Sequence, residues 1–231
     1  MATTSVDNPF YYDPPKENIK GGVIVDIMQT IVIALAICVF IYVFLAIPNQ
    51  VDGQSMEPNF YNNELLLTNK VIQLIGDTDI GEKLHYNYER GDVVIFQLPN
   101  HPDFIKRVIA TPGDIIKIEN NHPIVNGNVV YESYIPSMTK TLGGTFLKEG
   151  EEKVIPEGYY FVLGDNREAS KDSRSSDIGF IERKYIKGKV FLRIVPFGRF
   201  GLIGRGTYRE ELEAGILGLT YLPQQLYKLI K

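Results

Sequence analysis

The feature that most limits how this chain can fold is a long uncharged apolar run from Ile27 to Ile47, bounded by Asp26 and Pro48. A helix of this length extends roughly 30 Å at about 1.5 Å per residue, which matches the hydrocarbon core of a bilayer. The apolar core of a cleaved signal peptide is shorter, at about 7–15 residues, and a buried helix of a soluble protein is usually amphipathic or shorter. The run therefore predicts an uncleaved signal anchor that crosses a membrane once.

The residues before this run indicate how the anchor is oriented. Met1–Gly22 is a polar, proline-containing segment that we expect to be a short flexible tail. Lys16 and Lys20 are its basic residues, and the positive-inside rule favours the cytoplasm for this end of the anchor. We therefore expect a cytoplasmic tail over 1–22, an anchor over 23–47 in the cell (inner or plasma) membrane, and an extracytoplasmic remainder.

After the anchor the sequence changes to short apolar runs separated by turn residues, which is typical of strands. The runs are Glu64–Thr68, Val93–Leu98, Phe104–Ile109, Ile124–Val130, Tyr159–Leu163 and Lys189–Val195. Asn126-Gly127 within the fourth run is the strongest local signal, because this pair favours a two-residue hairpin turn. No long helical pattern separates the runs, so residues 48–200 are predicted to form a mainly β, antiparallel domain.

Two interpretations stay open for the C-terminal tail, residues 201–231. Arg209–Leu219 has the composition of a short helix, and Tyr221–Lys231 is apolar and basic. Such a helix either lies at the surface and touches the membrane or packs on the β-rich domain.

Composition argues against several classes of function. The formal net charge of −4 gives no basic signal for nucleic acid. The single cysteine, Cys38, lies inside the apolar run, so no internal disulfide is expected. His85, His101 and His122 are scattered and lack the spacing of metal ligands. We therefore expect no nucleic-acid partner, no metal site and no cofactor.

Ser55 lies eight residues past the end of the apolar run, so whatever it does takes place close to a membrane surface. Gly53 and Pro58 mark bends on either side of it. Most serines at such positions are turn residues, and a nucleophilic serine needs a base beside it. Both roles are open from the local sequence alone.

Lys106 has an unusual place in its predicted strand. Alternation puts Phe104, Lys106 and Val108 on one apolar face. In one interpretation the lysine stem covers this face while the ammonium reaches solvent at the strand edge. In the other the amine is desolvated, its pKa falls from about 10.4 towards neutrality, and it can accept a proton from a serine hydroxyl. No histidine has a context that recommends it as a competing base.

The segment Gly164–Arg174 follows an apolar strand and is dense in hydroxyl and charged groups. A solvated surface loop is one interpretation. In the other, Ser170 hydrogen-bonds an amine and holds it in place, while Asp172 and Arg174 brace the site through a salt bridge.

These stretches occur in one order behind the anchor, namely Gly53–Pro58, Arg90–Val94, Ile105–Val108, Pro112–Asp114 and Gly164–Arg174. The order resembles the motifs of the bacterial type I signal peptidases (leader peptidases), and the resemblance extends from about Ile27 to Phe197. It implies a signal-peptidase-type antiparallel β catalytic domain behind a single N-terminal transmembrane helix. It also implies a serine endopeptidase that removes N-terminal signal peptides from exported preproteins, cutting after small residues in an Ala-x-Ala-like pattern.

The resemblance assigns a catalytic role to three side chains. Ser55 becomes the nucleophile, Lys106 the general base, and Ser170 the residue that orients the lysine. The implied partners are exported preproteins and membrane lipid, and the chain is expected to be a monomer.

Around this dyad the resemblance implies a structural ion pair of Asp172 with either Arg107 or Arg174. Small residues at the scissile bond suit shallow apolar pockets. The expected pocket walls are apolar residues near the dyad, namely Val51, Ile95 and Ile105.

The chain also departs from some members of the family. Where they carry a serine two residues before the nucleophile, with a hydroxyl that helps to hold the oxyanion, this chain has Gly53. The Ser55 backbone N–H is then the expected first donor, and the second donor stays open. The stretch between Asp114 and Gly164 is short, so any accessory β-subdomain is expected to be small.

Two rival functions remain for comparison. A self-cleaving repressor uses a Ser–Lys mechanism on a related β-fold, but it carries a DNA-binding helical domain where this chain has a predicted span. A membrane-tethered, non-catalytic β-domain that binds partners is the alternative from another class. It leaves the arrangement of Ser55, Lys106 and Ser170 unexplained.

Overall fold

The computed structural model of the chain describes residues 19–40, 46–76, 78, 81 and 87–206. The chain divides into two compact units, Met1–Tyr42 and Val43–Lys231. The first unit contains one apolar helix, and the second contains antiparallel strands. The predicted fold class, mainly antiparallel β behind one N-terminal apolar helix, is confirmed.

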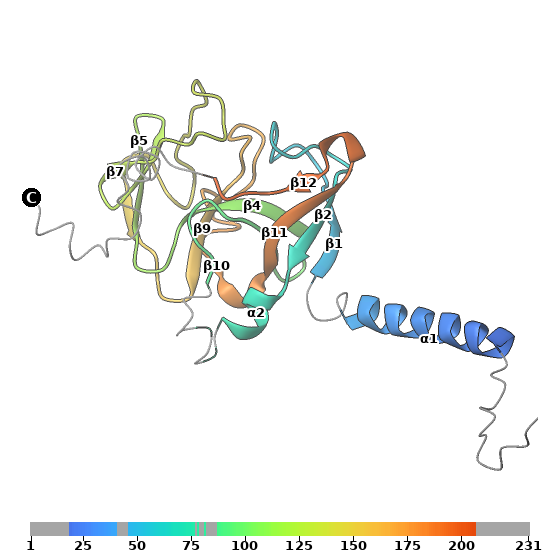
Figure 1. Cartoon of the computed structure of the whole chain (residues 1–231). Coiled ribbons are helices and arrows are strands. Elements are labelled where there is room, and N and C mark those ends of the chain that lie inside the picture. The colour runs from blue at the N-terminus through green and yellow to red at the C-terminus, as the bar shows by residue number, and fades with distance from the viewer. Residues whose placement is uncertain (1–18, 41–45, 77, 79–80, 82–86, 207–231) are drawn as a thin grey trace, which may run out of the picture. The chain divides into compact units, whose positions relative to one another are not determined.

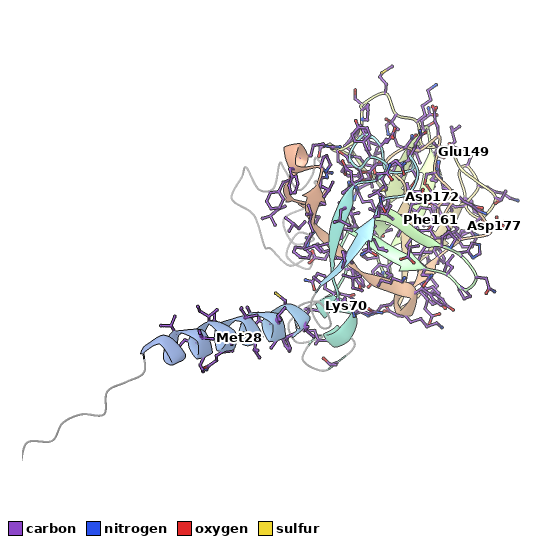
Figure 2. All side chains as sticks on the ribbon, turned by 90° about the vertical axis from the view of Figure 1, so that its right-hand side faces the viewer. Met28, Lys70, Glu149, Phe161, Asp172 and Asp177 are labelled. Carbon is purple, nitrogen blue, oxygen red and sulfur yellow. The ribbon has the colours of Figure 1, made fainter. Side chains whose placement is uncertain are left out.

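Helix α1 (Ile19–Phe40) is the element expected from the apolar run. Its segment Gly22–Phe40 is long and apolar enough to cross a membrane, with a mean hydropathy of 2.6 and no part of it buried. Figure 2 shows the side chain of Met28 projecting from this helix. The helix begins inside the segment expected to be a tail, because the last helix-breaking proline before it is Pro15. The rest of that segment, residues 1–18, lies outside the described residues.

Strand β1 (Ala46–Gln50) begins before the expected end of the anchor at Ile47. Ala46 and Ile47 pair with the last two residues of β2 (Leu65–Asn69) instead of extending a helix. The sequence alone does not separate the end of a membrane helix from the start of a strand at Ala46 and Ile47, since apolar residues suit both.

The large sheet has the strand order β1-β2-β11-β3-β4-β9-β10, and β12 pairs with β11 (Figure 1). Its other strands are β3 (Val93–Gln97), β4 (Asp103–Ala110), β9 (Tyr159–Leu163), β10 (Ile181–Glu182), β11 (Ile186–Val195) and β12 (Gly201–Leu202). Among the described residues, this part of the chain also contains the short helices α2 (Val71–Ile75), η2 (Arg183–Tyr185) and η3 (Phe197–Arg199). Strand β11 pairs with both β2 and β3, so it joins the hairpin at the start of the domain to the strands in its middle.

A second, four-stranded sheet has the order β7-β6-β5-β8 and is the small accessory subdomain expected from the sequence. Its strands are β5 (Ile115–Glu119), β6 (His122–Val125), β7 (Asn128–Val129) and β8 (Glu152–Val154). Between β6 and β7, Asn126 and Gly127 have φ values of 53° and 80°, and this hairpin turn requires two positive values. The predicted Asn-Gly hairpin is therefore confirmed.

Within the described part of the chain, the buried apolar residues form three clusters. One lies on the face of the large sheet that carries Val108 and Tyr160. A second joins the opposite face, through Phe161, to the small sheet through Ile116; Figure 2 labels Phe161. The third includes Met56 and anchors the loop between β1 and β2.

The β-domain continues past the predicted boundary at residue 200. Strand β12 pairs with β11, and the Gly206 N–H donates to Gly91 O over 3.0 Å. The helices expected within 209–231 lie outside the described residues.

Candidate active site

Ser55 is carried by the loop that joins strands β1 and β2. The Val51 N–H donates to Glu64 O over 2.8 Å and closes this loop at its neck. Met56 and Phe60 are only 1% and 2% exposed, and both pack in the third core cluster. The apolar neighbours of Ser55 therefore hold the loop against the domain and fix the position of the hydroxyl.

Lys106 lies in strand β4 and is 3% exposed. Its Nζ is 2.7 Å from Ser55 Oγ and 2.8 Å from the Ile105 carbonyl oxygen. The Phe104 ring lies on the same side, with its centroid 5.7 Å from Nζ. The structure thus brings together the predicted serine and lysine, which are far apart in the sequence, within hydrogen-bonding distance.

Burial lowers the pKa of Lys106 from 10.5 to about 8, because an ammonium loses its hydration inside the domain. The carboxylates of Asp172 and Asp165 oppose this shift by attracting the charged form, but burial has the larger effect. An amine with a pKa of about 8 is neutral in part of the molecules near neutral pH. The pair can therefore pass a proton from the serine hydroxyl to the lysine.

Gly164, directly after strand β9, packs between the two loops of the site. A Cβ added there would lie 2.2 Å from Ser170 Oγ and 2.5 Å from the Ser55 carbonyl oxygen, far inside van der Waals contact. A side chain at this position would push the Ser55 loop away from the segment that carries Ser170. The sequence marked Gly164 only as the first residue of the segment Gly164–Arg174 and gave no sign of this close approach.

Ser170 is close to the dyad, but its Oγ is buried without a hydrogen-bond partner among the described residues. The bond to Lys106 expected from the family resemblance is not formed in this geometry, where the amine contacts Ser55 and the Ile105 carbonyl instead. The role of Ser170 stays a proposal.

Asn166 connects the same two loops through its backbone and its side chain. Its N–H donates to Ser55 O over 3.0 Å, and its Nδ2 donates to Gln54 O over 3.2 Å. These bonds fix the backbone of the serine loop, and sequence reasoning did not single out Asn166.

Of the two ion pairs left open for Asp172, the structure forms the one with Arg174. Arg174 Nε donates to Asp172 Oδ1 over 2.8 Å, and Nη2 donates to Oδ2 over 2.9 Å. Asp172 Oδ2 also accepts the Gly164 N–H over 3.1 Å. The ion pair therefore braces the turn after β9; Figure 2 labels Asp172 inside the β-domain.

Arg107 pairs instead with Asp165, which the sequence analysis did not identify. Nε and Nη2 of Arg107 donate to the two carboxylate oxygens over 2.9 and 2.7 Å, and both side chains are almost fully buried. The register places Arg107 opposite Leu163, two residues before Asp165. The position of Asp165 just after an apolar strand was visible in the sequence and could have marked it as a candidate partner. Only the strand register shows that it meets Arg107.

The three predicted wall residues line one small pocket of about 220 Å³ beside the dyad, which we call the acyl pocket. They are Val51, Ile95 and Ile105, and all are buried. Phe104 and Asp52 also line it. Its small volume suits small side chains, and its lining combines these apolar walls with polar residues, including Asp103.

The backbone around Ser55 bears on how an oxyanion can be held. The Ser55 N–H makes no hydrogen bond within the described part of the chain, so it is available as a donor. The Gly53 N–H already donates to Asn62 Oδ1 over 2.9 Å, and Gly53 has φ of 89°. The residue two positions before the nucleophile thus offers neither a hydroxyl nor a free N–H.

The chain is similar in sequence to known signal peptidases. The family model described as signal peptidase, peptidase S26, matches residues 24–195. The chain is 32% identical to signal peptidase I of Bacillus amyloliquefaciens, over 77% of this chain and 91% of that protein. It is 35% identical to signal peptidase I P of Bacillus subtilis subsp. natto, over 80% and 96%. It is 34% identical to signal peptidase IB of Staphylococcus aureus (strain COL), over 74% and 89%.

A solved structure of a signal peptidase I from Enterococcus faecalis aligns at 27% identity with a TM-score of 0.37, over 45% of this chain and 96% of that one. The family model covers most of this chain, and so do relatives more than 30% identical to it. The chain therefore belongs to the signal peptidase family, peptidase S26, and is a serine peptidase.

Proposed function

We propose that this chain is a membrane-anchored endopeptidase that removes signal peptides from exported preproteins with a Ser55–Lys106 dyad. One observation carries the proposal, namely the 2.7 Å contact between Ser55 Oγ and a buried amine. The lowered pKa of Lys106, about 8, supports the same role, because a base must be neutral to accept a proton.

In the first step, neutral Lys106 Nζ accepts the proton of Ser55 Oγ as that oxygen attacks the scissile carbonyl carbon. The Ser55 N–H is available to donate to the resulting oxyanion. The tetrahedral intermediate collapses, the C–N bond breaks, and Lys106 gives its proton to the leaving amine. The products of this step are an acyl-enzyme ester on Ser55 and a free N-terminus.

In the second step, Lys106 accepts a proton from water, whose oxygen attacks the ester carbonyl carbon. The ester bond breaks, and the proton returns to Ser55 Oγ. Lys106 acts as base and then acid in each step, which requires that its position be fixed. The Ile105 carbonyl oxygen, 2.8 Å away, helps to hold Nζ in place.

The acyl pocket supports cleavage after small residues. Val51, Ile95 and Ile105 leave about 220 Å³ beside the dyad, and their buried side chains offer no charge to a substrate. Large side chains at the scissile bond would lack room there, and acidic side chains would be repelled by Asp52 and Asp103, which also line the pocket. Ala-x-Ala-like segments satisfy both conditions.

Helix α1 supports the membrane part of the proposal. An exported preprotein stays tethered by its own apolar segment, so an enzyme anchored by one span meets the cleavage site at the membrane surface. We propose that the N-terminus is cytoplasmic and the β-domain extracytoplasmic, with exported preproteins and membrane lipid as partners of a monomer.

The decisive test is cleavage of a purified preprotein by the full chain and by Ser55→Ala. The variant is expected to lose at least about 10³-fold in kcat/KM while keeping its fold, because the nucleophile is lost and little packing changes. Ser137→Ala removes the same atom from an exposed loop and serves as the control. Appreciable turnover by a clean Ser55→Ala preparation would exclude Ser55 as the nucleophile.

A further inference from the structure

A second pocket of about 450 Å³ borders the loop of Ser55, and the loop residues that line it come after the serine in the chain. We call it the leaving-group pocket. Its lining includes Glu57, Pro58, Met138, Asn166 and Glu168. No step proposed above uses these side chains.

The serine loop runs from one pocket to the other. Its residues Val51 and Asp52 line the acyl pocket, and Glu57 and Pro58 line the leaving-group pocket. Ser55 lies between these pairs in the chain. An endopeptidase substrate continues on both sides of the scissile bond. When its acyl side occupies the first pocket, the residues after the scissile bond extend from Ser55 towards the second pocket.

Asn166 strengthens the link between the leaving-group pocket and the nucleophile. It lines this pocket, and its N–H and Nδ2 donate to the carbonyl oxygens of Ser55 and Gln54. The wall of the leaving-group pocket is therefore bonded directly to the backbone of the nucleophile.

The charged residues that line the leaving-group pocket do not cancel one another. Asp165 is paired with Arg107, and Arg167 is paired with Glu132. Glu57 and Glu168 belong to none of the ion pairs formed within the described part of the chain, and Glu168 is exposed. The charge presented to an occupant is therefore negative.

We propose that the leaving-group pocket binds the segment just after the scissile bond, which is the start of the mature protein. Glu57 and Glu168 then favour substrates with lysine or arginine in this segment over substrates with aspartate or glutamate. This inference rests on the proposed function and specifies which substrate residues are preferred after the scissile bond. A basic side chain gains attraction to the two carboxylates, while an acidic side chain is repelled by them.

The test uses three peptides with one Ala-x-Ala acyl side and two lysines, two glutamines or two glutamates at the second and third positions after the bond. The wild-type full chain in detergent is expected to favour the lysine peptide over the glutamate peptide by about two- to tenfold in kcat/KM, a range typical of a few partly exposed charge pairs. The double variant Glu57→Gln, Glu168→Gln should bring this ratio close to one. The ratio is taken within each enzyme, so that a uniform loss of activity cancels.

Glu157→Gln is the matched control. Glu157 is an exposed carboxylate before strand β9, at the opposite end of that strand from Gly164, and its replacement should leave the ratio unchanged. The wild-type ratio should also fall as ionic strength rises. Equal rates for the lysine and glutamate peptides, or an unchanged ratio in the double variant, would overturn the inference. Either result leaves the proposed function intact as long as cleavage of the glutamine peptide still depends on Ser55.

Discussion

At the scale of single residues, the unusual group is Lys106, a lysine that is 3% exposed on a strand of the core. Lysine is almost never fully buried unless it is paired, because the ammonium loses its hydration. Here the nearest polar groups are a hydroxyl and a carbonyl oxygen, while the carboxylates of Asp172 and Asp165 act from further away. This environment destabilises the charged form and lowers the pKa of Lys106 to about 8, which suits a base.

The pH dependence of cleavage tests this role directly. Lys106 must be neutral to act, so kcat/KM should rise with pH through about 8 and be low below that value, not across the range near 6.5 typical of histidine. Lys106→Arg keeps the charge, but a guanidinium is not deprotonated in proteins, so this variant should be as inactive as Lys106→Ala.

Lys187→Arg is the control for the Lys106 variants, because Lys187 is a lysine of strand β11 that pairs with Asp103 near the surface. It should keep its activity and its pH profile. A Lys106→Arg enzyme with near-normal activity would exclude Lys106 as the base.

At the scale of elements, the site is made where the turn after β9 meets the loop between β1 and β2. Gly164 allows the close approach, Asn166 bonds the serine loop, and the Asp172–Arg174 ion pair braces the turn. Strand β4 supplies the lysine and, through Arg107, a buried ion pair with Asp165. Three separate elements must therefore keep their spacing for one dyad to form.

Gly164→Ala tests this spacing. The added Cβ would overlap Ser170 Oγ and the Ser55 carbonyl oxygen, so the serine loop must shift. We expect a loss of at least about tenfold in kcat/KM and a lower free energy of unfolding by about 1–3 kcal/mol, the usual range for overpacking. Gly198→Ala is the control, since a Cβ there meets nothing within 4 Å. Equal activity of the two variants would show that the contact at Gly164 does not position the serine.

At the scale of the whole molecule, the chain consists of a helical unit and a β-unit that begins at Val43. The β-unit has its own core clusters, and its first strand starts at Ala46. The helical unit supplies an apolar surface with none of its span segment buried.

A truncated chain that starts at Val43 should therefore fold and cleave short Ala-x-Ala peptides, though less well than the full chain cleaves preproteins. A chain that starts at Pro48 loses Ala46 and Ile47, and with them two of the paired positions between β1 and β2. The shorter chain should be less stable in denaturant unfolding measured by circular dichroism. Equal stability would show that these two positions add nothing to the sheet.

The orientation of the anchor is tested on the intact chain. A reporter that is active only outside the cytoplasm, fused after Lys231, should be active if the two lysines before the helix stay in the cytoplasm. Activity of a cytoplasm-only reporter at the same point would reverse the proposed topology.

Local patterns were enough to predict the apolar helix, most strands and the Asn126-Gly127 turn. They depend on neighbouring residues, whose periodicity and turn preferences act over a few positions. The end of the helix was harder to place, because Ala46 and Ile47 are as apolar as a membrane span but belong to strand β1. Ordered motifs together with the family resemblance also indicated Ser55 and Lys106 as a pair.

Only the tertiary structure decided which distant parts of the chain are in contact. The partner of Arg107 is Asp165, because the register of β4 against β9 brings the residue just beyond Leu163 to this arginine. Asp172 then pairs with Arg174, two residues away in the same turn. The need for Gly164 follows from how closely two loops approach each other. The pKa of Lys106 likewise depends on burial, which is a property of the packed domain and not of any short stretch of sequence.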